Sequence, residues 1–231
     1  MEQDRRIIWA LLVVSLAGFI IVGWFITKPQ PLGPVDAKMP VWAAFASICV
    51  LGAVATLIPH RCHPSKSLPL SLDPKRFTRV IGFKLVHGHH PACGKFSDHE
   101  LLIGGKTFCA GCAGLFVGAL ASLSVATMHF LYNYRLPIVS GYFGLGFVLI
   151  GLLAVPLTKK RTPLLRSGLN AILVLGFSLV LVTVDLFGDM GFDFFVIGMC
   201  TYWMYVRIQL SRWSHDEVCG GCEDECEKKA E

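Results

Sequence analysis

Charged residues are scarce in this sequence, and their scarcity excludes most water-soluble proteins. Asp, Glu, Lys and Arg make up 16% of the 231 residues, whereas 54% are hydrophobic, and the mean hydropathy is +0.59. Repeats at solenoid periods are absent, as are the alternating ten-residue segments of a membrane β-barrel. We therefore expect an all-α membrane protein, because only helices and closed barrels satisfy the backbone inside lipid.

Sequence signatures of nucleotide-dependent or hydrolytic enzymes are missing as well. The chain contains no Walker-type phosphate loop, no dinucleotide fingerprint and no Ser-His-Asp order. The first apolar run is longer than a signal-peptide core and has no Ala-x-Ala cleavage site, so we expect it to stay as an anchor. The net charge of +5 follows from membrane topology and predicts no nucleic-acid partner. On this basis we expect a protein that is not an enzyme.

Six apolar runs are long enough for membrane-spanning helices, since about 20 apolar residues cross a hydrocarbon core of about 30 Å. They are residues 7–26, 40–59, 112–131, 137–157, 169–187 and 190–210. In the last run Asp193 and Arg207 flank the apolar centre, so this helix spans only if Arg207 extends to the headgroups. The predicted fold class is an all-α polytopic membrane protein with six transmembrane helices.

The distribution of positive charge predicts the orientation. With six spans, 18 of the 21 Lys and Arg residues fall on the side of both termini, and only Lys28, Lys38 and Arg135 fall on the other side. Because positively charged segments stay in the cytoplasm, we expect a multi-pass protein of the cell membrane with both termini cytoplasmic. The expected partners are the lipid bilayer and either other membrane subunits or further copies of the chain.

This topology divides the chain into four parts. They are a transmembrane hairpin (1–59), a cytosolic His/Cys loop (60–111), a four-helix transmembrane region (112–210) and a cytosolic Cys-rich acidic tail (211–231). Small residues inside the runs predict close helix packing. They are Gly114, Gly118 and Ser122 in the third run, and Gly144, Gly146 and Gly151 in the fourth.

Polar residues inside or at the ends of the runs are given structural roles. Three of them lie within runs, where a buried thiol or a helix-end histidine is usually structural: Cys49, Cys200 and His129. Three carboxylates lie around the turn before the sixth run, where we expect them to cap helix starts: Asp185, Asp189 and Asp193.

Cysteine and histidine are concentrated in the segments predicted to be cytosolic. In the loop, the pair His90 and Cys93 is separated by 15 residues from the pair Cys109 and Cys112. This is the spacing of structural zinc ribbons, in which a two-residue gap lets both members of a pair reach one tetrahedral ion. The sequence therefore predicts a small zinc-ribbon-like loop, and four ligands would leave no open position for a substrate.

A short hairpin is predicted between the two ligand pairs. Residues 101–108 are apolar enough for two strands and contain Gly104 and Gly105 as a turn that would bring the pairs together. The histidine position stays open, because other side chains near the loop could take the place of His90. They are His87, His89 and His99 in the loop itself, and Cys62 and His63 after the second run.

The tail offers ligands for a second ion. Within twelve residues it contains one imidazole and three thiols, those of His215, Cys219, Cys222 and Cys226. We therefore expect one or two zinc ions, while the alternative is an acidic tail that shares ligands with the loop or carries free thiols. An iron-sulfur cluster is the alternative cofactor, although the sequence lacks the ferredoxin spacing.

The residues around the second cysteine pair resemble a known family. Residues 109–118 read Cys-Ala-Gly-Cys-Ala-Gly-Leu-Phe-Val-Gly and follow a loop that contains His-Pro. In this respect residues 87–118 are similar to small prokaryotic membrane proteins of the domain-of-unknown-function family 2085. Gly111 stands where that family usually has a basic residue between the cysteines. The resemblance implies a prokaryotic membrane protein and implies no activity.

Three functions are compatible with these residues. The first is a non-enzymatic scaffold or subunit of a membrane complex, with a structural cytosolic zinc site. The second is a membrane thiol oxidoreductase that uses Cys109 and Cys112, because a helix N-terminus stabilises a thiolate. The third is an iron-sulfur electron-transfer subunit.

Overall fold

The chain forms a bundle of long helices with two small hairpins at one end. The computed structural model describes residues 2–27, 39–57, 77–80, 83–86, 97–157, 162–187 and 189–220. Its helices are α1 (Glu2–Thr27), α2 (Met39–Leu57), α3 (Ala110–Tyr132), α4 (Val139–Leu157), α5 (Pro163–Asp185) and α6 (Met190–Gly220). The hairpins pair β1 (Phe77–Val80) with β2 (Phe83–Val86) and β3 (Glu100–Ile103) with β4 (Lys106–Cys109), and a 3₁₀ turn, η3 (Ser97–His99), precedes β3.

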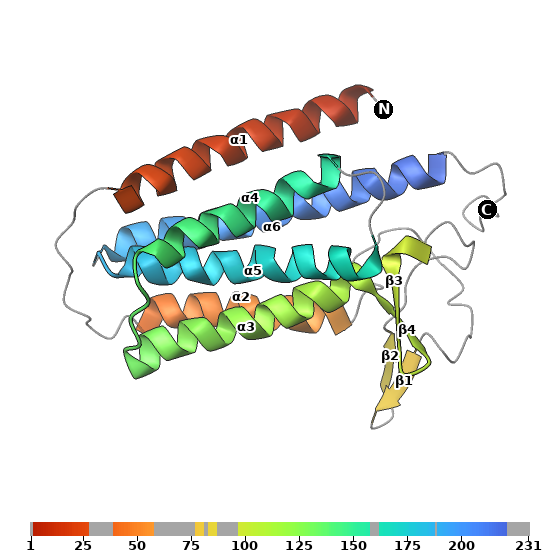
Figure 1. Ribbon diagram of the computed structural model, residues 1–231, viewed down its shortest axis with the longest axis horizontal. Coiled ribbons are helices and arrows are strands. Elements are labelled where there is room, and N and C mark those ends of the chain that lie inside the picture. Colours follow the sequence, from red (N-terminus) through yellow and green to blue (C-terminus); the bar gives the residue numbers. More distant parts are fainter. Residues whose placement is uncertain are drawn as a thin grey trace.

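Successive helices run in alternating directions along the bundle (Figure 1). The helices α3 and α5 begin at the end that carries the hairpins, and α2, α4 and α6 finish there. We call this the hairpin end, and we call the opposite end, where α3 and α5 finish, the far end. Because of the alternation, segments that are far apart in the sequence meet at the hairpin end.

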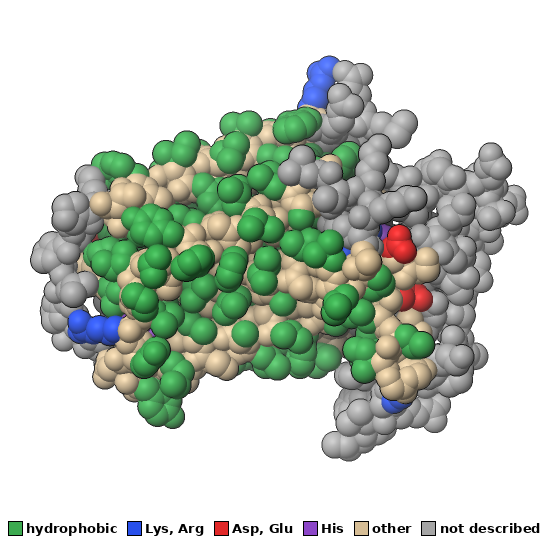
Figure 2. All heavy atoms as spheres, viewed as in Figure 1, with side chains coloured by type: hydrophobic (Ala, Val, Ile, Leu, Met, Phe, Trp, Pro, Cys, Tyr) green, Lys and Arg blue, Asp and Glu red, His purple; other side chains and the backbone are tan. Residues whose placement is uncertain are grey.

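Five of the described helices, α1 to α5, are long and apolar enough to cross a membrane. On the face shown in Figure 2, hydrophobic side chains cover the helices, and the acidic and basic side chains lie toward the ends. Large apolar residues of α1, such as Trp9 and Ile20, are exposed on the surface of the bundle. These features fit the expected class of helical membrane proteins, since a soluble protein rarely exposes so extended an apolar surface.

The helix α6 differs from the other five. It is the longest, with 31 residues, but it is not among the five membrane-crossing candidates. Asp193 and Arg207 flank its apolar centre as expected, yet both are packed against protein: Asp193 is 0% and Arg207 is 8% exposed. The structure therefore does not show Arg207 extending to the headgroups, which was the condition set for a sixth span, and this span stays a prediction.

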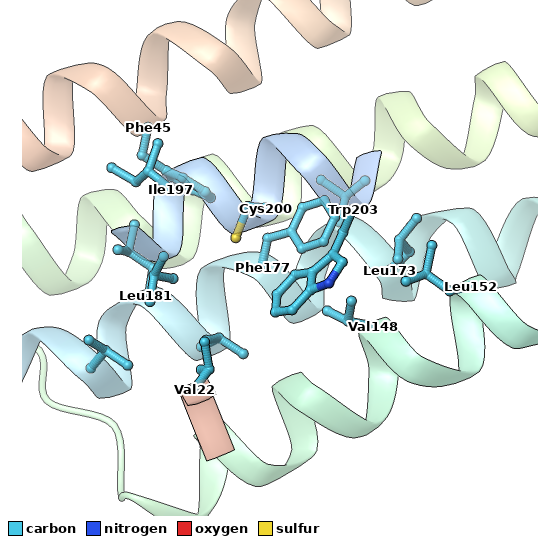
Figure 3. Packing of buried hydrophobic residues seen from close by; sticks show 14 of the residues in the cluster. Val22, Phe45, Val148, Leu152, Leu173, Phe177, Leu181, Ile197, Cys200 and Trp203 are labelled. Carbon is cyan, nitrogen blue, oxygen red and sulfur yellow. The ribbon is translucent and has the colours of Figure 1, made fainter. Parts of the chain in front are cut away.

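The helix α5 lies at the centre of the bundle. It packs against α3, α4 and α6, and 61% of its apolar stretch is buried, compared with 22% for α1. In Figure 3, Trp203 of α6 lies over Phe177 of α5, with the two rings stacked at an interplanar angle of 19°. Val148 and Leu152 of α4 lie beside this pair. In lipid such packing, rather than escape from water, holds helices together.

A row of small residues brings α3 close to α5. A Cβ atom on Gly114 would overlap the backbone of Ser167, and one on Gly118 would lie 2.8 Å from a backbone oxygen of α5. One turn further along, the Ser122 hydroxyl donates a hydrogen bond of 2.6 Å to the carbonyl of Val174. The predicted packing role of this row is confirmed.

The glycines of α4 do not all pack in the same way. A Cβ on Gly144 would lie 2.9 Å from the carbonyl oxygen of Gly176, and one on Gly151 would lie 2.7 Å from Leu173, both on α5. No atom lies within 4 Å of a Cβ built on Gly146, so its predicted packing role is wrong within the described structure. The reason is geometric, because two positions along a helix amount to about 200° of rotation.

Two local features differ from the sequence prediction. The helix α5 begins at Pro163, ahead of the predicted start at residue 169, because Thr162 caps it: its Oγ1 accepts a hydrogen bond of 3.3 Å from the Leu165 amide. The predicted span left out this first turn of α5 because Arg166 interrupts the apolar residues there. The β1–β2 hairpin was not predicted either, since it lies in the segment assigned to the loop.

The hairpin predicted between the ligand pairs is confirmed as β3–β4. Gly104 and Gly105 connect the strands with φ angles of +57° and +76°. Two successive positive φ angles give a type I′ turn, whose twist matches that of the flanking strands and which glycine adopts without steric cost. The hairpin leads directly into α3, since Cys109 ends β4 and Ala110 begins the helix.

Candidate functional site

Two of the predicted metal ligands lie on the turn that joins β4 to α3. Cys109 is the last residue of β4 and the N-cap of α3, with φ −68° and ψ 120°, and Cys112 lies in the first helical turn. We call residues 109–112 the thiol turn. Cys109 is 6% exposed and Cys112 is partly buried, and neither forms a disulfide within the described residues. Positions three apart at a helix start lie on one side of the helix, so the turn can direct both sulfurs to one partner.

The helix α5 supports the thiol turn from behind. The Asn170 side-chain amide donates a hydrogen bond of 3.1 Å to the carbonyl oxygen of Gly111, inside the turn. Asn170 is 3% exposed, and its Oδ1 atom has no hydrogen-bond partner among the residues that the structure describes. The turn is therefore held to α5 through its backbone.

Gly111 fits this close arrangement because it has no side chain. A Cβ atom at this position would lie 3.3 Å from Asn170 Nδ2 and 3.8 Å from Cys109 Sγ. The first of these distances is shorter than an ordinary contact, so a long basic side chain here would displace Asn170. This is a physical reason for a glycine at this position.

Arg166 places a cation near the thiol turn. It lies one helical turn before Asn170 on α5, and both Asp98 and Cys109 act electrostatically on its guanidinium group. The turn η3 and the strand β3 also contact α5, so this end of the helix carries the hairpin as well as the thiols. A cation near a sulfur atom favours the thiolate, which is the form that binds metals and attacks disulfides.

Among the alternative ligands, His99 belongs to the described residues and precedes the hairpin that ends in the thiol turn. It ends η3 and is 7% exposed. The next residue, Glu100, is the cross-strand partner of Cys109 in the β3–β4 hairpin, so strand pairing brings the two ends of the hairpin together. Even so, no three His, Cys, Asp or Glu side chains converge as metal ligands within the described residues.

The structure says less about the other predicted ligands. His215 and Cys219 belong to the last turns of α6, which finishes at the hairpin end (Figure 1). Most of the remaining candidates lie outside the described residues: Cys62, His63, His87, His89, His90, Cys93, Cys222 and Cys226. The described structure thus places two of the four ligands of the first predicted site together.

A second polar cluster lies at the far end of the bundle. His129 Nε2 lies 2.9 Å from Asp185 Oδ2, and His129 Nδ1 lies 3.2 Å from the carbonyl oxygen of Tyr134. The sequence indicated no such pair, because the two residues are 56 positions apart and belong to different helices. Among the three carboxylates expected to cap helices, Asp189 does so, since its Oδ1 accepts bonds of 2.9 and 3.1 Å from the first amides of α6.

Sequence reasoning also missed Arg166 and Asn170. A signal for them existed: they are four positions apart at the start of an apolar helix, and that spacing puts them on one helical face. What the sequence could not indicate is that this face packs against the thiol turn.

Comparisons of the chain with protein families, with curated proteins and with solved structures find no match. The fold and the site therefore define only the general class of the protein. It is a helical bundle of the membrane type with a pair of thiols at one end.

Proposed function

We propose that this chain is an integral membrane protein in which one zinc ion at the hairpin end ties the loop that precedes β3 to the helix bundle. It then works as a non-enzymatic scaffold or as a subunit of a membrane complex. The observation that carries the proposal is the thiol turn, whose backbone is held by Asn170 and which places two cysteines that form no disulfide three positions apart at the start of α3. Cys109 and Cys112 would supply two ligands, and His90 and Cys93, or His99 in place of His90, would supply the others.

The chain order around the β3–β4 hairpin supports this ligand set. One ligand pair precedes the hairpin, the other begins at its last residue, and a two-residue turn at Gly104 and Gly105 reverses the chain between them. A reversal of this kind lets both flanking segments meet at one ion. Zinc would contribute folding free energy here, because a short polar loop buries little apolar surface of its own.

The charge near the thiols also supports a metal. Three thiolates and one imidazole around Zn²⁺ carry one net negative charge, and Arg166 is a cation that interacts with Cys109. Groups in contact with the ligands orient them and tune their affinity. Asn170 and Arg166 would serve this purpose from α5 and so connect the metal site to the bundle.

Elemental analysis of the full-length protein, purified under reducing conditions in lipid nanodiscs, tests the proposal. We expect about one zinc ion per chain at this site and up to one more at the tail. Cys109→Ser and Cys112→Ser should each remove one zinc, whereas Cys200→Ala, in the buried core, should remove none. A folded, reduced protein that contains no metal would contradict the proposal, and stoichiometric iron with visible absorption would indicate an iron-sulfur cluster instead.

One observation favours a second function, that of a membrane thiol oxidoreductase. Cys109 lies at the N-terminus of α3 with the Arg166 cation nearby, a setting that stabilises a thiolate. The two functions differ in thiol reactivity, because zinc protects its ligands from alkylation. Rapid labelling of Cys112 in intact cells by a membrane-impermeant thiol reagent would support the oxidoreductase, and protection that a chelator removes would support zinc.

A further inference from the structure

The pair of His129 and Asp185 is buried at the far end of the bundle, away from the thiol turn. His129 lies in the last turn of α3, and Asp185 is the last residue of α5. Their side chains are only 2% and 3% exposed, and the atoms Nε2 and Oδ2 are 2.9 Å apart. Ionisable groups at such positions in membrane proteins are costly and usually have a function.

The hydrogen bonds of the histidine ring determine how many protons the pair holds. Nε2 faces the carboxyl group of Asp185, and Nδ1 lies 3.2 Å from the carbonyl oxygen of Tyr134, which can only accept. A neutral imidazole carries one N–H group and cannot donate to both. Both bonds form only if the ring is doubly protonated beside a carboxylate, or if a protonated carboxyl donates to Nε2 while Nδ1 donates to the carbonyl. The two forms contain the same number of protons.

The surroundings of the pair favour this extra proton. With it both hydrogen bonds of the ring have a donor, whereas without it a lone pair of the ring would face an oxygen atom. The Phe130 ring lies edge-on at 4.9 Å from the imidazole, and the nearby hydroxyls of Ser140 and Thr183 bond to each other at 3.0 Å. Arg135, in the connection that follows α3, is exposed.

The pair also lies close to the level at which the bundle would meet water. Tyr132 and Tyr134, just beyond His129, are 72% and 57% exposed. Exposed tyrosines at helix ends are typical of the interface between membrane and water. A proton would therefore travel about one helical turn, roughly 5 Å, between the pair and the solution.

We propose that His129 and Asp185 form a proton-binding site, which holds one proton more than a neutral imidazole beside a carboxylate and exchanges it with the solution at the far end. The site fastens the end of α3, the connection after it and the end of α5 to one another. It is independent of the zinc site, because it lies at the other end of the bundle.

Spectroscopy of the protein in nanodiscs at neutral pH tests the proposal. We expect either ¹⁵N resonances of a doubly protonated His129 ring or the infrared band of a protonated carboxyl group, and either result shows the proton. In Asp185→Asn, the amide can donate to Nε2 and Nδ1 can still donate to Tyr134, so the fold should persist while that signal is lost. Ser140→Ala, which removes only the neighbouring hydroxyl bond, should leave the signal unchanged.

A wild-type protein with a singly protonated ring beside an ionised carboxylate would overturn the proposal, and this holds even if the Asp185→Asn variant does not fold.

Exchange in D₂O tests the access of the site to solution. The proton of the pair should exchange well before the backbone amides in the middle of α5. A proton that exchanges as slowly as those amides would contradict the route to the far end.

Discussion

Single polar side chains join α3 to α5 at three levels of the bundle. Asn170 donates to the backbone of the thiol turn, Ser122 donates to Val174, and His129 pairs with Asp185. Each bond crosses between helices instead of closing within one. Interhelical hydrogen bonds in membranes contribute about 0.6 kcal/mol on average and up to about 1.7 kcal/mol. Their combined contribution to stability is therefore small, and their main effect is to fix the position of α3 along α5.

At this scale we predict that Asn170→Ala destabilises the fold by about 1 kcal/mol, since the carbonyl oxygen of Gly111 loses its buried donor. The matched control is Ser178→Ala. Ser178 is buried on the same helix, but its hydroxyl donates to the carbonyl of Leu175 within that helix and makes no bond to another helix among the described residues. Reversible unfolding in lipid, measured for both variants, distinguishes the two cases. Equal losses in free energy would contradict a specific role for Asn170.

At the scale of helices, α5 is the element on which the others are assembled. Its N-terminal half carries the thiol turn and the start of α3, its C-terminal half carries the His–Asp pair, and α4 packs along it through glycine contacts. Small residues allow this because they let two backbones approach to contact distance. The hairpin at the start of α3 is placed by the same contact, since β3 and η3 rest on α5.

For this reason we expect two neighbouring glycines of α4 to respond differently to the same substitution. Gly144→Ala introduces a methyl group 2.9 Å from the α5 backbone and should cost about 1–3 kcal/mol of stability. Gly146→Ala adds a methyl group that meets no atom within 4 Å, and it should change the stability by less than about 0.5 kcal/mol. Thermal or denaturant unfolding of both variants in one lipid provides the comparison. A larger loss for Gly146→Ala would mean that α4 is rotated relative to this structure.

At the scale of the whole molecule, the alternating direction of the helices collects the starts of α3 and α5 and the end of α6 at one end (Figure 1). If α6 crosses the membrane as the other helices would, this arrangement presents those segments to the same aqueous compartment. The helix α6 follows the five candidate spans. If it also crosses the bilayer, its end and the tail lie on the side of the N-terminus, and if it does not, they lie on the opposite side.

Reporter fusions on either side of α6 test this directly. We expect a reporter fused after residue 187 to lie outside the cytoplasm and one fused after residue 220 to lie inside it, since positive charge favours a cytoplasmic hairpin end. A reporter inserted in residues 133–137 should lie outside the cytoplasm and serves as the control. If both α6 fusions report the same side, α6 does not span and the tail cannot share a compartment with the loop.

The sequence by itself determined the class of protein, the approximate bounds of the helices, the β3–β4 hairpin and the small-residue row of α3. These features depend on local properties: the length of an apolar run, the φ angles that glycine adopts, and the spacing of small residues along one helix. The predicted thiol pair is local in the same sense, because its two cysteines are three positions apart.

Only the tertiary structure decided which residues meet across helices. It turned Gly144 toward α5 and Gly146 away from it, placed Asn170 against the thiol turn, and joined His129 to Asp185 over 56 positions. The physical reason is that the rotation and vertical position of a helix are set by its packing partners. A nearly uniform apolar sequence, surrounded by lipid that is equally apolar, contains little information about which of its faces those partners will cover.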